Sequence, residues 1–376
     1  MHRLSLWILL TCITLTSFAQ ESAVVSQAEA NEQADTLNSL VKVDTNPQKK
    51  VKIFAIPLVF YSPDTRLGLG AGGIATFRPA GTPQPSNVTF SLAYTQRKQL
   101  LVWFPYQIYF GREKFVAFGE VGWFRYVYQF FGIGNNIDND YLEKYTTEFP
   151  RVRITLLRNV KNGNAFGLRL AYDNFNITQY DSSGLLLQKN ITGWQGGQSA
   201  GAGLVWWKDT RNNRFYPTKG WFIESSLFFE NKWTGSDYQY SRFSIDAARY
   251  FALGEKNVLA LHGMAIGTLG DAPFFSTAFL GGTKRLRGYF EGKYRDDHLL
   301  LAQAELRREL FGRIGGAVFT GVGTVFGTPG ESAKIRPNVG LGVRFQVDKK
   351  QKLNIRADYG IGVKNQGFYL TFGESF

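Results

Sequence analysis

Residues 352–359 read KLNIRADY, a strict alternation of polar and apolar side chains. Because successive side chains of a β-strand point to opposite faces, this pattern predicts a strand with one apolar and one charged face. Residues 219–230, KGWFIESSLFFE, follow the same rule. A soluble β-sandwich would alternate as well, but a tilted membrane strand needs about 9 to 11 residues, whereas strands of soluble proteins favour roughly five or six. The length of these segments therefore favours a membrane strand.

About sixteen such segments follow one another, separated by clusters of Gly, Asn, Asp and Pro, and even numbers in this range are typical of bacterial barrels. They begin near Ile53, Leu67, Asn87, Gln99, Lys114, Glu148, Asn164, Gln198, Lys219, Tyr238, Lys256, His298, Arg313, Arg336, Lys352 and Gln366. If the N-terminus is periplasmic, the longest connections, residues 128–147, 179–197 and 269–297, lie outside the cell. We therefore predict an all-β fold, a transmembrane antiparallel β-barrel of about 16 strands whose closure removes exposed edges.

The composition agrees with strands that face lipid on one side and water on the other. The chain has 32 Phe, 18 Tyr, 8 Trp and 41 Gly, with aromatic residues making up 15% of the sequence. Its formal charge of +13 fits solvated loops, a basic lumen, and contact with outer-membrane lipids and lipopolysaccharide. Because we expect the chain to be exported, nucleic acid is not an expected partner. The predicted location is the bacterial outer membrane.

The N-terminus resembles a secretory signal peptide. A basic start precedes an apolar run over residues 4–18, and Ser17 and Ala19 give the small-x-small pattern before a cut at Gln20. A membrane anchor would need roughly 20 apolar residues, and lipidation of Cys12, the one cysteine, is the other alternative. We expect residues 1–19 to be the signal peptide, 20–50 a periplasmic linker and 51–376 the barrel. The mature chain then has no cysteine for a disulfide or a thiolate metal site.

Catalytic chemistry finds little support in the sequence. His262 and His298 are the histidines that remain after signal removal, and no cluster has metal-ligand spacing. We expect no enzyme, cofactor or metal. The one catalytic alternative is His262 on the outer wall of the barrel, where a Ser-His pair would face lipid.

Residues 279–309, FLGGTKRLRGYFEGKYRDDHLLLAQAELRRE, contain the most specific motif. Gly281 and Gly282 give a flexible entry to a basic aromatic tip, Arg287-Gly288-Tyr289. The next strand carries Glu305-Leu306-Arg307. A second motif precedes them, with Asp209 and Arg211 followed by FYPTKG, which ends in Gly220 and includes Pro217.

Together these motifs resemble the barrel of the BamA/TamA assembly-factor family, the bacterial surface antigens, over residues 209–376. The family pattern is a GG-x4-RG[FY] loop, a strand with E-L-R, and a D-x-R…[FY]-P-[ST]-x-G turn on the periplasmic side. The resemblance implies that the long outer loop folds back into the lumen. There its Arg would meet carboxylates of the inner wall.

Strand register predicts the partners of that arginine. Leu301, Gln303, Glu305 and Arg307 share one face, so Glu305 points into the barrel, and Asp358 does so by the same alternation. We predict that Arg287 pairs with Glu305 or Asp358, the alternative being an outer-loop arginine in water. The family usually places a lumenal Asp where this chain has Gly321, so one partner is missing and the contact is weakened or rewired.

The end of the chain alternates as well. Phe368, Leu370, Phe372 and Phe376 fall on one face by this alternation, and we expect barrel-assembly machinery to read the strand by β-augmentation.

The resemblance implies a role in outer-membrane biogenesis: barrel-protein insertion, protein translocation or lipid movement through a seam between the first and last strands. We expect the chain to lack POTRA modules and to act on a client outer-membrane or exported protein. Pro57 would weaken the ladder at the seam. The alternatives are a passive pore or structural barrel, and a surface receptor for which the sequence offers no site.

Overall fold

The computed structural model describes residues 51–376 except 63–65, 80–81, 83–84, 139 and 350–351. The predicted signal peptide and linker, residues 1–50, lie outside the described residues. Within this part of the chain, no helix is long and apolar enough to cross a membrane.

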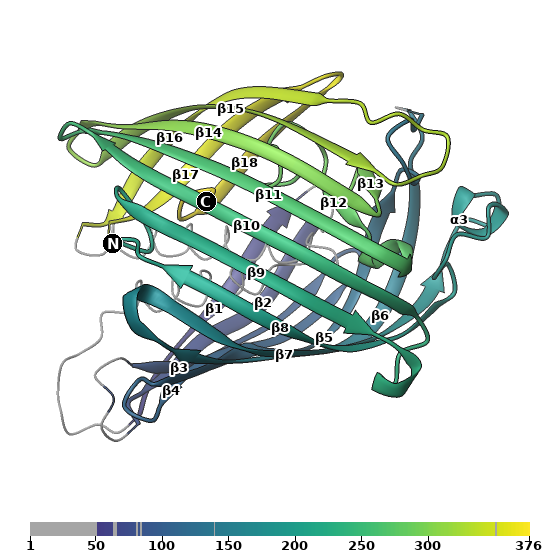
Figure 1. Ribbon diagram of the computed structural model, residues 1–376, viewed down its shortest axis with the longest axis horizontal. Helices are drawn as coiled ribbons and strands as arrows, with labels where there is room; N and C mark the ends of the chain where they lie inside the picture. Colours follow the sequence, from purple (N-terminus) through teal and green to yellow (C-terminus); the bar gives the residue numbers. More distant parts are fainter. Residues whose placement is uncertain (1–50, 63–65, 80–81, 83–84, 139, 350–351) are drawn as a thin grey trace.

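The expected fold class is confirmed: one antiparallel sheet of 16 strands dominates the structure and curves around a central space (Figure 1). Its strands are β1 (Val51–Ser62), β2 (Arg66–Phe77), β3 (Ser86–Thr95), β4 (Leu100–Phe110), β5 (Phe115–Phe130), β6 (Glu143–Asn159), β7 (Asn164–Gln179), β8 (Gly196–Asp209), β9 (Gly220–Glu230), β10 (Gln239–Leu253), β11 (Asn257–Asp271), β14 (His298–Phe311), β15 (Ile314–Phe326), β16 (Arg336–Asp348), β17 (Leu353–Gly362) and β18 (Asn365–Phe372). Every predicted start lies within two residues of a strand start, except Glu148, which lies five residues inside β6.

Each strand pairs with the next strand of this sheet along the chain, with β11 followed by β14, so β1 and β18 end the strand order. Connections alternate in length. The turn end of the barrel carries short connections, such as residues 254–256 and 312–313, and the loop end carries residues 131–142, 180–195 and 272–297. The loop end also holds the short helices α3 (Leu185–Gln188), η2 (Lys232–Thr234) and η3 (Phe274–Ser276), whereas η1 (Lys161–Gly163) lies in a turn at the turn end.

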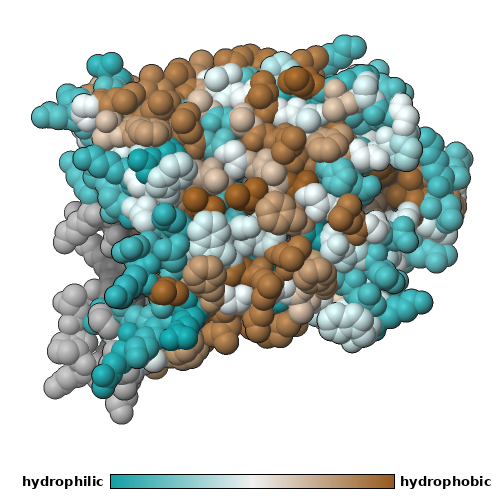
Figure 2. Space-filling model, in the orientation of Figure 1, coloured by the Kyte–Doolittle hydropathy of each residue, from teal (hydrophilic) through white to brown (hydrophobic). Residues whose placement is uncertain are grey.

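The alternation of side chains matches the predicted faces. On β16, Val339, Leu341 and Val343 are exposed, whereas Arg344 is buried on the inner face. Apolar side chains gather in a broad area across the middle of the outer surface, with hydrophilic residues towards both ends (Figure 2). This distribution fits an outer face that contacts lipid and a lumen lined by polar groups.

Two features depart from the expected pattern. Strands β5 and β6 are 16 and 17 residues long, so the predicted loop at residues 128–147 shrinks to 131–142. Tyr128 and Tyr145 stack across this extension with ring centroids 5.6 Å apart, and aromatic cross-strand pairs stabilise a ladder. The second departure is a small hairpin, β12 (Ala278–Leu280) with β13 (Tyr294–Asp296), within the longest connection.

The outward face yields a prediction about depth in the membrane. Leu341 is 61% exposed at the middle of β16, and Leu341→Arg is expected to lower the free energy of unfolding by about 2–4 kcal/mol in lipid vesicles. Leu253→Arg, the same change at the turn-end limit of β10, is expected to cost about 0–1 kcal/mol. Urea unfolding followed by tryptophan fluorescence measures both. Equal costs would contradict the proposed membrane position of the barrel.

Candidate functional site

The connection between β11 and β14 folds into the barrel, as the family resemblance implied. Its hairpin of β12 and β13 packs inside, and Leu280, Leu286, Tyr289 and Tyr294 join one buried cluster with side chains of the wall. Arg287 is fully buried at the tip of this loop. We call residues 281–293 the lumenal loop.

Arg287 contacts both of its predicted partners. Its Nη1 atom donates to Asp358 Oδ2 at 2.5 Å, and its Nη2 atom donates to Glu305 Oε2 at 2.5 Å. The side chains of all three residues are fully buried. The guanidinium also lies 3.5 Å from the centroid of the Phe319 ring, which gives a cation–π contact. The lumenal loop is therefore held by charge-assisted hydrogen bonds away from water.

The pair belongs to a larger group that we call the lumenal ion network. Its members are Arg287, Arg307, Arg344, Arg356, Glu305, Asp358 and Glu374. Arg307 Nε donates to Glu305 Oε1 at 2.6 Å, as the shared face of these two residues suggested. Arg344 reaches all three carboxylates. Buried charges are tolerated when they are paired in this way, and removing one partner leaves an uncompensated charge.

Glycines allow the tip to approach the wall. Gly288 has φ 108° and lies on the backbone of β17, where an added Cβ would come within 2.9 Å of Gly360 and Ile361 atoms. A Cβ at Gly360 would come within 2.8 Å of the Arg287 carbonyl carbon. Tyr289 then anchors the tip, donating its hydroxyl to Pro337 O at 2.7 Å and accepting from Val363 N–H at 3.0 Å.

The contact is rewired around Gly321. Gly321 pairs with Asn338 in the ladder, and Asn338 Nδ2 donates to Arg287 O at 2.6 Å. A Cβ at Gly321 would lie 2.8 Å from Gln303 Cγ. The chain therefore holds the backbone of Arg287 through an amide at this level, while Glu305 and Asp358 hold its guanidinium.

The turn motif closes tightly at the turn end. Arg211 donates to both carboxylate oxygens of Asp209 at 3.0 Å and lies over the Phe222 ring. Gly220 has φ 107°, and an added Cβ would clash with Thr210 O. Pro217 lies buried in the same segment, beyond Phe215 and Tyr216.

Side chains from this turn reach under the barrel. Burial raises the pKa of the Tyr216 phenol. Arg214 Nη1 donates to the Tyr109 hydroxyl of β4 at 3.4 Å, and Lys352 Nζ lies 5.8 Å from the Tyr216 ring. The connection between β8 and β9 thus reaches β4 and the residue just before β17 at the turn end.

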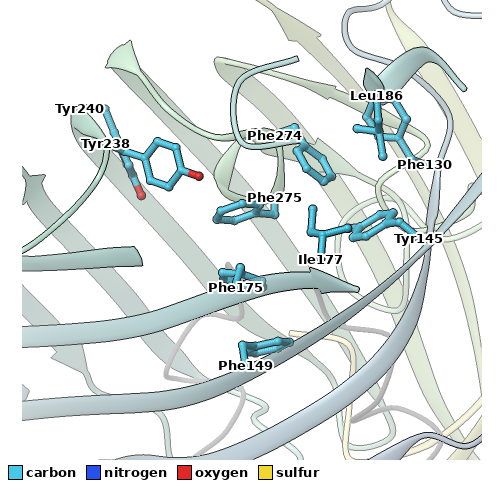
Figure 3. Packing of buried hydrophobic residues seen from close by; sticks show 10 residues of the cluster. All are labelled: Phe130, Tyr145, Phe149, Phe175, Ile177, Leu186, Tyr238, Tyr240, Phe274 and Phe275. Carbon is cyan, nitrogen blue, oxygen red and sulfur yellow. The ribbon is translucent and has the colours of Figure 1, made fainter. Parts of the chain in front are cut away.

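At the loop end, an aromatic cluster fills the space between the walls and the long connections (Figure 3). Its core is Phe130, Tyr145, Phe149, Phe175, Ile177, Leu186, Tyr238, Tyr240, Phe274 and Phe275. Phe275 of η3 stacks on Phe175 with centroids 4.1 Å apart, and Phe274 meets Phe130 edge-on. The sequence offered the high aromatic content as a signal but not these partners.

A second contact ties the β5–β6 loop to the β15–β16 loop. Asn135 is buried, and its Nδ2 atom donates to Val325 O at 2.8 Å. Glu331 Oε2 accepts from the backbone N–H groups of Asn135 and Asn136. Arg336 Nη2 donates to Asn135 O at 2.6 Å. Sequence reasoning missed this contact, because nothing local to residue 135 indicates it.

The predicted face of Phe376 is wrong. Phe368 is exposed on the outer face, but β18 ends at Phe372, and residues 373–376 turn into the lumen. Phe376 stacks on His262 with centroids 4.7 Å apart, and Arg307 Nη2 donates to its carbonyl at 2.9 Å. Leu370 is half-buried on the strand itself. The inward turn explains why Glu374, outward by simple alternation, joins the lumenal ion network.

The catalytic alternative, which placed His262 on the outer wall, does not match the structure. His262 faces the lumen, with its side chain 2% exposed. Its Nε2 atom is 2.9 Å from Asp246 Oδ1, and its Nδ1 atom is 2.9 Å from Gln303 Nε2. Both ring nitrogens are engaged, so a Ser-His pair facing lipid is not formed at this residue.

Comparison with known proteins agrees with this geometry. The family model described as the Omp85 superfamily domain matches residues 79–376. The fold is similar to BamA from Haemophilus ducreyi lacking POTRA domains 1–3, with a TM-score of 0.61, 16% identity, and coverage of 86% of this chain and 69% of that chain.

Two further structures are similar. CdiB from Acinetobacter baumannii gives a TM-score of 0.56 at 13% identity, covering 86% of this chain and 60% of that one. CdiB from Escherichia coli gives 0.59 at 11% identity, covering 87% and 62%. The chain thus spans about three-fifths of each CdiB chain, and at these identities the likeness concerns the fold. No curated protein sequence matches the chain.

The network yields a prediction about Arg287. Arg287→Ala removes two buried charge-assisted hydrogen bonds, to Glu305 and Asp358, and the contact with the Phe319 ring, so the free energy of unfolding should fall by about 3–5 kcal/mol. Arg287→Lys keeps the charge without the fork and should lose less. Urea unfolding in vesicles measures the cost, and limited proteolysis reports release of the lumenal loop.

Arg249→Ala is the matched control for this prediction. Arg249 lies over the Trp221 ring on the outer face, 4.6 Å from its centroid, and its loss should cost about 0.5–1 kcal/mol. If Arg287→Ala cost no more than Arg249→Ala, the lumenal ion network would not be what holds the loop.

Proposed function

Because the chain belongs to the Omp85 superfamily, we propose that it acts in outer-membrane biogenesis by inserting or translocating a client polypeptide at the seam between β1 and β18. Its barrel would lie in the outer membrane, with lipids and lipopolysaccharide around the apolar area across the middle of its outer surface. The client is an outer-membrane or exported protein.

The observation that carries this proposal is the occupied lumen. The lumenal loop, the ion network and the aromatic cluster place buried side chains along the inside of the barrel. An extended polypeptide passing through the middle would have to displace paired charges, and breaking such pairs is costly. A route at the wall avoids this cost.

The seam offers such a route. In the described part of the chain, β1 pairs with β2 alone and β18 with β17 alone. A strand edge presents N–H and C=O groups that an incoming strand can pair with, which is β-augmentation. Pro57 lies within β1, opposite Ala71, and supplies no N–H to a ladder. An imperfect ladder at β1 favours exchange with a client strand.

The passive-pore alternative predicts a different lumen. A pore needs a continuous water-filled path, whereas the loop tip here is bonded to β14 and β17, and the Asn135 contact links loops across the loop end. Gly321, where the family usually places a lumenal Asp, would favour a pore if it released the loop. The amide of Asn338 holds the loop at that level instead.

Site-specific photo-crosslinking in cells tests the proposal. A photoreactive residue at Ile53 on β1 or Phe368 on β18, both exposed on the outer face, should capture nascent outer-membrane or exported proteins. The same probe at Leu168 on β7, which is also exposed, should capture lipid but no client. Equal client capture at all three positions, or none at Ile53 and Phe368, would rule out a seam-based mechanism.

A further inference from the structure

The edge strand β18 is tied to the lumenal loop at three levels. Near its start, Lys293 Nζ donates to Asn365 Oδ1 at 3.0 Å. At mid-strand, the Tyr369 hydroxyl meets the loop tip. Beyond its end, Ser375 Oγ donates to Thr283 O at 2.9 Å. The loop therefore contacts the inner side of β18 at Asn365 and Tyr369 and the tail beyond it at Ser375.

Tyr369 makes the central contact through both functions of its hydroxyl. The oxygen accepts from Gly288 N–H at 2.9 Å, and the hydroxyl donates to Tyr289 O at 3.2 Å. Tyr369 lies opposite Asp358 in the β17–β18 ladder, so it shares the inner face with the carboxylate that holds Arg287. Its neighbour Phe368 points outward.

The hydrogen bonds of the Tyr369 hydroxyl link movement of β18 to the backbone of the loop tip. Gly288 N–H is buried against β17, where a lost partner leaves a donor without a hydrogen bond. Any displacement of β18 away from β17 carries the Tyr369 hydroxyl with it. Displacing β18 therefore removes the hydrogen-bond acceptor of the Gly288 N–H group, which lies next to Arg287.

We propose that Tyr369 is a positioning residue that couples the edge strand β18 to the Arg287 tip, so that opening of β18 and release of the lumenal loop occur as one event. The biological role of this coupling rests on the proposed function, in which a client strand that pairs with β18 would loosen the loop. The coupling itself is a property of the barrel and is measured without any client.

Hydrogen–deuterium exchange of the purified barrel in lipid nanodiscs tests the coupling. Tyr369→Phe removes one hydroxyl and keeps the ring. Amides of residues 365–372 and 283–293 should exchange about tenfold faster in Tyr369→Phe, while β5 to β8 are unchanged. Tyr359→Phe is the matched control, because that hydroxyl also bonds across to β18, at Gln366 Oε1, but on the exposed outer face.

A double-mutant cycle separates coupling from simple loss of stability. Combining Tyr369→Phe with Arg287→Lys should raise exchange in β18 by less than the product of the single effects, because either change alone releases the shared contact. The proposal would be overturned if the effects of the two single substitutions on exchange simply multiplied in the double variant. It would also be overturned if exchange rose equally throughout the sheet, or if Tyr359→Phe had the same effect as Tyr369→Phe.

Client capture at Phe368 distinguishes this inference from the proposed function. If exchange follows the expected pattern while neither wild type nor Tyr369→Phe captures a client, the coupling stands and the proposed function fails. If clients are captured but exchange in β18 and the loop is uncoupled, the assignment of Tyr369 fails alone.

Discussion

The structure depends on one buried guanidinium. Arg287 is carried into the lumen by a loop and is bonded there to Glu305 of β14 and Asp358 of β17, with the Phe319 ring of β15 beneath it. In this water-poor space the charges are held by each other rather than by solvent, so removing one partner is far more costly than at a surface. The neighbouring strands β14 and β15, strand β17 and the longest loop are thereby fixed in one arrangement. The RG tip needs glycine next to arginine because the two backbones touch at Gly288 and Gly360.

Side chains and connecting segments occupy much of the inside of the barrel. The aromatic cluster and the Asn135 contact occupy the loop end, the 209–220 connection lies across part of the turn end, and the tail at residues 373–376 turns inward beside the ion network. These groups occupy the interior through which a channel would have to run. The edge strand β18 is bonded to the lumenal loop at Asn365 and Tyr369, and the tail that follows it is bonded to the same loop at Ser375. The lumenal loop and the β18 side of the seam are thus connected by direct hydrogen bonds.

Much of this could be predicted from alternation and motif spacing. Strand starts, the inward direction of Glu305 and Asp358, and the inward fold of the loop all follow from period-two patterning and the RGY motif. Arg344 and Arg356 were accessible to the same logic, since both lie at inward positions of alternating strands. Glu374 and Phe376 were not, because alternation places Phe376 with Phe368 and the tail leaves the strand. Contacts such as Asn135 to Val325 join residues 190 apart in the chain through a backbone carbonyl, which has no side-chain signature.

A cross-link between the lumenal loop and the C-terminal tail tests most directly whether the loop is held inside the barrel. The described residues contain no native cysteine, so Thr283→Cys with Ser375→Cys supplies a single thiol pair at a contact of 2.9 Å between the Ser375 hydroxyl and the Thr283 carbonyl. In cells, we expect the two thiols to join as a disulfide or through a short bifunctional reagent, and mass spectrometry detects the product. Thiols that remain separate and are both labelled from outside by a membrane-impermeant maleimide would contradict a loop held inside the barrel.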